Sequence, residues 1–193
     1  GHCSLLLSYL KFKTTLFSIV KYEKPWELLS RKGVEIAFQP KSIKNLNFKD
    51  KSFNISVSCG VLEHVRETGG DEIESLKELS RVTKDFIVIY HLPNKYSWIE
   101  WFTRSFRSGV YSHPYRYTNS EINNMVKQIK DFELDEIILY GFLPRRIGKM
   151  VKNRNLGYLL HLLDKFLSKT MLKNIGQAYY IKLKAKNFEN TRA

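Results

Sequence analysis

Residues 46–65 read LNFKDKSFNISVSCGVLEHV, and this stretch decides the fold. Residues 54–58 form a short run rich in Ile, Val and Ser, which is typical of a buried strand. Cys59 and Gly60 interrupt the run, and a helical pattern begins at Val61. Small residues therefore follow the carboxyl end of a strand, which is where a parallel sheet opens toward a ligand crevice.

Segments that suit helices and strands continue along the chain. Further helix and strand patterns follow at residues 75–84, 86–94, 117–129, 132–140 and 176–185. Taken in this order, the segments resemble the class I S-adenosylmethionine-dependent methyltransferases. In that family a VLEHV motif follows the fourth strand, and a Pro-Asn pair ends the fifth, as HLPN does here. The resemblance covers nearly all of the chain.

The first third of the chain fits the same scheme. Residues 14–20 and 34–38 predict two strands, and Pro25 suits the first turn of a helix between them. Alternating strands and helices predict an α/β fold with a parallel sheet and helices on both faces. The resemblance implies a Rossmann-like sheet whose last strand is antiparallel. We expect residues 1–193 to form a single methyltransferase-like domain.

The start of the sequence departs from the family. Residues 2–10 predict a helix, which in the family follows the first strand and a glycine-rich turn. Gly1 matches the last glycine of that turn. We therefore expect the family's first strand and most of the turn to be missing, so that the sequence is an N-terminally truncated form.

The resemblance implies S-adenosylmethionine as the cofactor. The positions that it assigns to cofactor binding are Gly1, Ser42, Ile43, Ser58, Cys59 and Gly60. The family's ribose-binding acid falls at Val20, with Glu23 as the nearest carboxylate, and its adenine-contacting Asp falls at Ser42. A lost charged hydrogen bond is worth about 1.5 to 3 kcal/mol, so these exchanges predict weak or no cofactor binding. The small residues 58–60 are also explained by a helix entry that needs them.

His64 is the candidate catalytic residue. It follows the predicted strand by a few residues, and the ordinary pKa of histidine, about 6.5, suits removal of a proton from a hydroxyl acceptor. With Glu63 it could bind a divalent ion, or the two could simply hold the loop as a polar pair. We assign no metal site.

Aromatic residues are concentrated between Tyr90 and Tyr117. This segment of 28 residues holds nine of them, against about four expected from the 13% average of the chain. In the family, the corresponding insert, residues 95–118 here, covers the acceptor. We therefore assign acceptor binding to His91, Tyr96, Trp98, His113 and Tyr115. Trp98, Trp101 and Phe102 also fall at helical spacing, which an ordinary core would explain.

Charge and cysteine content limit the choice of partners. The formal net charge is +13, and residues 142–193 contribute ten of it. Residues 146–175 predict a basic amphipathic helical segment, which suits an anionic membrane surface or simply a Lys-rich helix that packs on the domain. Nucleic acid is disfavoured because no known RNA-binding motif is present. The chain has two cysteines, Cys3 and Cys59, and their spacing is not that of a metal site. We therefore expect free thiols and a cytoplasmic protein. If the basic helix binds lipid, we expect the protein at the inner face of the membrane.

Two functions follow from these patterns. The first is transfer of a methyl group from S-adenosylmethionine to a small-molecule or lipid-linked acceptor. The second is a methyltransferase-like domain without activity, which binds a membrane surface or a protein partner through its basic C-terminal region. Val20 and Ser42, in place of two expected acids, favour the second. Cofactor binding distinguishes the two.

Overall fold

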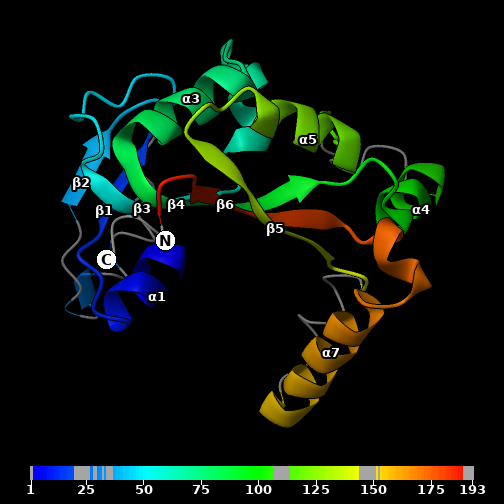
Figure 1. Cartoon of the computed structure of the whole chain (residues 1–193). Helices are drawn as coiled ribbons and strands as arrows, with labels where there is room; N and C mark the ends of the chain where they lie inside the picture. The colour runs from blue at the N-terminus through cyan, green and yellow to red at the C-terminus, as the bar shows by residue number, and fades with distance from the viewer. Residues whose placement is uncertain are drawn as a thin grey trace.

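The computed structural model describes residues 2–19, 37–106, 114–143 and 153–188, together with Glu27, Ser30, Arg31, Gly33 and Val151. Within these residues the strands form two sheets, one of two strands and one of four. Helices lie on both faces of the larger sheet, with α3 and α5 on one side and α1 on the other (Figure 1). The predicted α/β class, with helices on both faces, is confirmed.

The small sheet follows the first helix. Helix α1 (His2–Tyr9) leads into β1 (Thr15–Ser18), which pairs in parallel with β2 (Ala37–Pro40). The strand predicted at 34–38 therefore extends to Pro40, and its first residues, 34–36, lie outside the described part of the chain. The helix predicted from Pro25 also falls outside the described residues.

The large sheet has the order β3-β4-β6-β5. Strand β3 (Phe53–Cys59) runs parallel to β4 (Thr83–Pro93), and β6 (Ala178–Ala185) runs antiparallel to both β4 and β5 (Phe132–Tyr140). The predicted antiparallel last strand is thus confirmed. None of the described strands pairs with the outer edge of β3, so β1 and β2 are not hydrogen-bonded to the large sheet.

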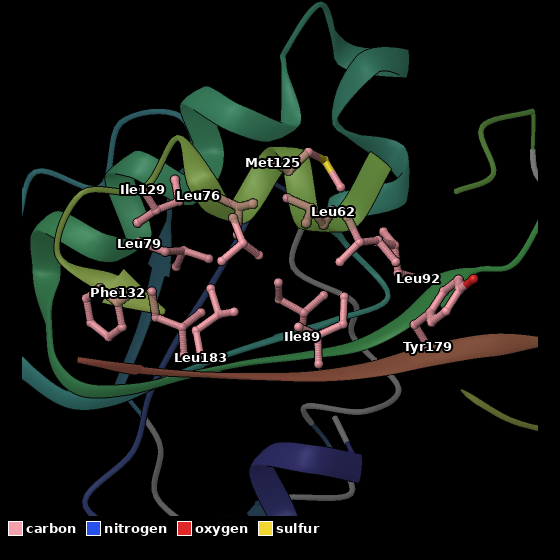
Figure 2. Close-up of a cluster of buried hydrophobic side chains, with 14 of the residues drawn as sticks. Leu62, Leu76, Leu79, Ile89, Leu92, Met125, Ile129, Phe132, Tyr179 and Leu183 are labelled. Atoms are coloured by element: carbon pink, nitrogen blue, oxygen red, sulfur yellow. The ribbon is translucent and has the colours of Figure 1, made fainter. Parts of the chain in front are cut away.

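The core lies between the large sheet and two helices. Helices α3 (Glu72–Val82) and α5 (Asn119–Lys127) present Leu76, Leu79 and Met125 toward side chains from β4 and β6 (Figure 2). Their apolar residues recur at three- and four-residue spacing, which places them on one helix face. Asp71 caps α3 by accepting backbone N–H groups of the first turn. The packed layer fixes β3 and β4, whose carboxyl ends carry the candidate site.

Four further helices complete the described chain. They are η1 (Leu62–Thr68), α4 (Trp98–Phe106), α7 (Arg154–Leu167) and η2 (Met171–Ile175). The helix predicted from Val61 is a 3-10 helix. It ends at Gly69, whose positive φ of 68° lets the Gly70 N–H reach the carbonyl of Val65 at 2.8 Å. The described part of the segment predicted at 146–175 consists of α7 and η2.

Candidate functional site

The exit of β3 carries a buried hydroxyl group and a tight glycine. The Ser58 side chain is only 4% exposed, and its Oγ has no hydrogen-bond partner among the described residues. Gly60 has a φ of +64°, and its N–H donates to the carbonyl of Tyr90 on the neighbouring strand at 3.1 Å. A β-carbon there would meet Glu63 Oε1 at 3.7 Å, an ordinary contact, so backbone strain rather than space favours glycine. Buried hydroxyl groups are nearly always hydrogen-bonded, so Ser58 calls for an explanation.

The loop after β2 lies beside this exit. The Lys44 ammonium group donates to the carbonyl of Gly69 at 3.0 Å, directly after η1, and so holds the loop against that helix. Ser42 Oγ accepts the backbone N–H of Lys44 at 3.4 Å. The side chain of Ile43 is buried in the core, which leaves its backbone for ligand contact. Gly1, Val20 and Glu23 lie outside the described residues.

Cys59 contacts the second cysteine of the chain. Its Sγ lies 3.3 Å from Sγ of Cys3 in α1, and both thiols are free. Desolvation by the surrounding chain, then the contact with Cys3, raise the pKa of Cys59 to about 12. The Cys59 thiol is therefore neutral near pH 7. This contact joins α1 to the end of β3, 56 residues away in sequence.

His64 lies on η1 and is paired. Its Nδ1 is 2.9 Å from Glu67 Oε1, and both side chains are partly exposed. A carboxylate at this distance orients the imidazole ring, as catalytic histidines require. Glu67 was not predicted as a site residue, although its spacing of three residues from His64 is a signal in the sequence. Glu63 belongs to the same helix and is buried. No group of three His, Cys, Asp or Glu side chains in the described chain could hold a metal ion.

The predicted acceptor residues fall into two groups. His91 sits at a bulge in β4 with a φ of +73°, and its Nδ1 lies 3.0 Å from the Tyr140 hydroxyl. Trp98 Nε1 donates to the carbonyl of Phe142 at 3.0 Å. His91 and Trp98 therefore both contact residues at or just after the end of β5. Tyr115 instead lies beside η1, with the Arg66 guanidinium 5.1 Å from its ring centre. Tyr96 is exposed, and His113 lies outside the described residues.

A buried ionic network joins the second group to the core. The Glu72 carboxylate accepts from Arg66 Nε at 2.8 Å and from the hydroxyl of Tyr117, and both Glu72 and Tyr117 are buried. Burial, followed by the hydrogen bond to Glu72, raises the pKa of Tyr117. The network fixes residues 115–117 against η1. The sequence carried no signal for it.

Asn94 directly follows β4, and its side chain binds residues near both α4 and β6. Its side chain is 0% exposed, and its amide nitrogen donates to the carbonyls of Asn174 and Gly176 at 2.9 and 2.8 Å. Its oxygen accepts the Tyr96 N–H and the Tyr179 hydroxyl, both at 3.1 Å. The Asn of the HLPN motif is therefore a structural clamp between the insert and β6.

An open hollow of about 420 Å³ lies at the other edge of the sheet, before β3 and β4 begin. Its lining includes Lys51, Arg81 and Asp131. Lys51 pairs with Asp131, and Arg81 with Asp50, so these charges are already neutralised by one another. Ligands of parallel sheets bind at the carboxyl ends of the strands, so we place the site at the exit of β3.

Known protein families and solved structures show what this chain is similar to. Residues 9–86 match the family model described as a methyltransferase domain. No curated protein is significantly similar in sequence. Among solved structures, a SAM-dependent methyltransferase from Thermotoga maritima is 15% identical, with a TM-score of 0.58 over 93% of this chain and 75% of that one.

Two further solved structures show the same fold. A SAM-dependent methyltransferase from Methanosarcina mazei has 16% identity and a TM-score of 0.59 over 94% of this chain and 86% of its own. The 1,6-didemethyltoxoflavin-N1-methyltransferase of Burkholderia thailandensis, solved with bound 1,6-didemethyltoxoflavin and S-adenosylhomocysteine, has 12% identity and a TM-score of 0.59 over 96% of this chain and 66% of its own. The chain therefore has the fold of the class I S-adenosylmethionine-dependent methyltransferases, and its residues 9–86 match the sequence pattern of a methyltransferase domain.

Proposed function

We propose that the chain transfers a methyl group from S-adenosylmethionine to a small-molecule or lipid-linked acceptor. The observation that carries this proposal is the buried Ser58 hydroxyl, which has no partner among the described residues and lies one residue from the tight turn at Cys59 and Gly60. A polar ligand at the exit of β3 would satisfy that hydroxyl. The family match over residues 9–86 supports the choice of ligand.

The residues present fit the methionine end of the cofactor better than its nucleoside end. Ser58, Cys59 and Gly60 would line the methionine part with a hydroxyl, a neutral thiol and backbone. Ser42 would offer a hydroxyl to the adenine, although that oxygen already accepts the Lys44 N–H. When bound, S-adenosylmethionine supplies an activated sulfonium methyl group. The protein must then align the acceptor and, where the acceptor is a hydroxyl, remove its proton.

We assign proton removal to His64. The Glu67 carboxylate accepts a hydrogen bond from Nδ1 of His64, which leaves the other ring nitrogen, Nε2, without a proton and able to act as the base. His91, Tyr96, Trp98, His113 and Tyr115 remain our assignment for acceptor binding. His91 and Trp98 are positioned by the end of β5, whereas Tyr115 is positioned by η1.

Binding of S-adenosylhomocysteine, measured by calorimetry, tests the cofactor assignment. We expect Ser58→Ala to weaken binding about 3- to 10-fold, the equivalent of one hydrogen bond, without destabilising the protein. Ser56→Ala is the matched control. Ser56 is buried on the same face of β3, but its hydroxyl lies 2.6 Å from Thr83 Oγ1, so this change should lower stability and leave binding intact.

A protein that does not bind S-adenosylhomocysteine, or a Ser58→Ala variant that binds it as tightly as the wild type, would refute the assignment. The first result would favour the inactive binding domain, for which the supporting observation is that Ser42 stands where the family has its adenine-contacting Asp. Once an acceptor is found, His64→Ala should lower turnover about 100-fold or more with little change in cofactor affinity. Unchanged turnover would return His64 to a structural role.

A further inference from the structure

Helix α7 is amphipathic but contributes no buried residue to the fold. Five large apolar side chains with exposures from 42% to 64% form a stripe along it: Leu156, Leu159, Leu162, Leu163 and Phe166. Their spacing of three and four residues places them on one side of the helix. Soluble surfaces rarely expose a continuous apolar stripe of this kind without a partner.

A neighbouring side of α7 attaches the helix to the body. Gly157, Leu160 and Leu167 are half-buried along this side. Near the C-terminal end of the helix, the Asp164 carboxylate accepts the backbone N–H groups of Gly141 and Phe142 at 3.0 and 2.6 Å. The attachment uses that end, and the helix extends away from the sheet (Figure 1). The apolar stripe is therefore accessible along its length.

Positive charge surrounds the stripe. Helix α7, η2 and the turn between them carry four exposed basic residues, Arg154, Lys165, Lys169 and Lys173. The sequence from 142 to 175 holds eight Lys or Arg residues and one acid, Asp164. Asp164, whose carboxylate accepts backbone N–H groups, offsets only one of these eight positive charges. A partner that covers the stripe must therefore offer an apolar surface to its side chains and negative charge to the surrounding basic residues.

A second copy of the chain meets this requirement poorly. Pairing two α7 helices through their stripes would bring two like-charged segments together, which is unfavourable. An anionic lipid surface satisfies both demands, because leucine and phenylalanine enter the acyl boundary while lysines meet the headgroups. We propose that α7 and η2 dock on an anionic lipid surface.

The insert lies on the same side as this surface. The loop that Asp164 holds, residues 141–143, also accepts the indole N–H of Trp98 through the carbonyl of Phe142. Helix α4 therefore shares its support with α7, and it exposes Trp101, at 67%, and Phe102. Trp is enriched at membrane interfaces, so α4 offers a second contact beside α7. None of the described helices has the length and apolar character needed to span a bilayer.

Vesicle flotation of the full chain tests the proposal. Wild-type protein should float with phosphatidylcholine vesicles that contain about one third phosphatidylserine, and not with phosphatidylcholine alone. The triple change Lys165→Gln, Lys169→Gln and Lys173→Gln should lower partitioning about 100-fold, at about fivefold per cation. Leu159→Ser with Phe166→Ser should lower it at least about tenfold. Because these residues are exposed, the thermal unfolding midpoint should not change.

The matched control replaces three exposed lysines elsewhere, Lys77, Lys84 and Lys127, with Gln. It removes the same charge and should keep most of the binding. Equal losses in both triple variants, or no flotation of the wild type, would overturn the proposal. A wild-type dimer in analytical ultracentrifugation that Leu159→Ser with Phe166→Ser converts to a monomer would overturn it too, by assigning the stripe to a second copy. All these readouts are independent of methyl transfer.

Discussion

Replacing Asn94 with Asp exchanges one side-chain nitrogen for oxygen at a buried position. The wild-type amide donates to the carbonyls of Asn174 and Gly176, and a carboxylate cannot donate to either. Losing two hydrogen bonds costs about 2 kcal/mol. Burial beside two carbonyl oxygens should also raise the pKa of the new carboxyl group by about 2 to 3 units, each worth about 1.4 kcal/mol. The Asn94→Asp variant should therefore lose about 5 kcal/mol at pH 7, out of the 5 to 15 typical of a domain.

The same reasoning gives a pH dependence with a definite sign. The pKa of the new carboxyl group is higher in the folded than in the unfolded state, where it is about 3.9. The variant is therefore most stable, relative to wild type, below about pH 4, and its loss grows as pH rises toward the folded pKa. At pH 4 the protonated acid can donate one hydrogen bond, which leaves a loss of about 1 to 2 kcal/mol.

Urea unfolding followed by Trp fluorescence at several pH values between 4 and 7 measures the loss in each state. Asn123→Asp is the control, because Asn123 is exposed on α5 and its exchange should cost little at any pH. A loss for Asn94→Asp that stays constant across this pH range, or that is below about 1 kcal/mol at pH 7, would refute the description of Asn94 as a buried clamp.

Two further predictions concern titrating groups. Because the pKa of Cys59 is raised to about 12, iodoacetamide at pH 8 should alkylate this thiol far more slowly than in the unfolded chain, as mass spectrometry would measure. Equal rates in the folded and unfolded chains would contradict the described environment. The raised pKa also means that the free energy of unfolding falls as pH rises above 9. In the capping box of α5, Thr118→Ala should cost about 1 kcal/mol near pH 7. Hydrogen bonds from Thr118 lower the pKa of Glu121, so this cost should shrink as pH falls below about 4.5, and a cost that stays constant down to pH 3 would argue against the box.

Local sequence patterns predicted most of the fold. The Ile and Val run of 54–58 predicted β3. The resemblance to the methyltransferase family predicted helices within 75–84 and 117–129, where α3 and α5 lie. The helix after Gly60 was predicted, but not its 3-10 form. That form is short and ends at Gly69 and Gly70, where the chain turns back on Val65. Local spacing does not distinguish such a short helix from an α-helix.

The candidate site was less predictable, because its contacts join distant residues. Cys59 meets Cys3, and Glu72 binds Tyr117 45 positions later. Asn94 was recognised as part of a motif, but its partners near residues 174–179 follow from the position of β6. The pair of His64 and Glu67 is the exception, since its spacing of three residues is a local signal. Long-range pairing depends on topology, which one sequence does not specify.

The strand order has a consequence for synthesis of the chain on the ribosome. Strand β6 lies between β4 and β5, although it follows both in sequence. While residues 178–185 are still inside the exit tunnel, β5 has no partner on that side and β4 exposes an open edge. Such edges recruit other strands. The nascent chain therefore needs protection of β4 and β5 until residues 178–185 have left the tunnel, because only then can β6 join the two strands in one sheet.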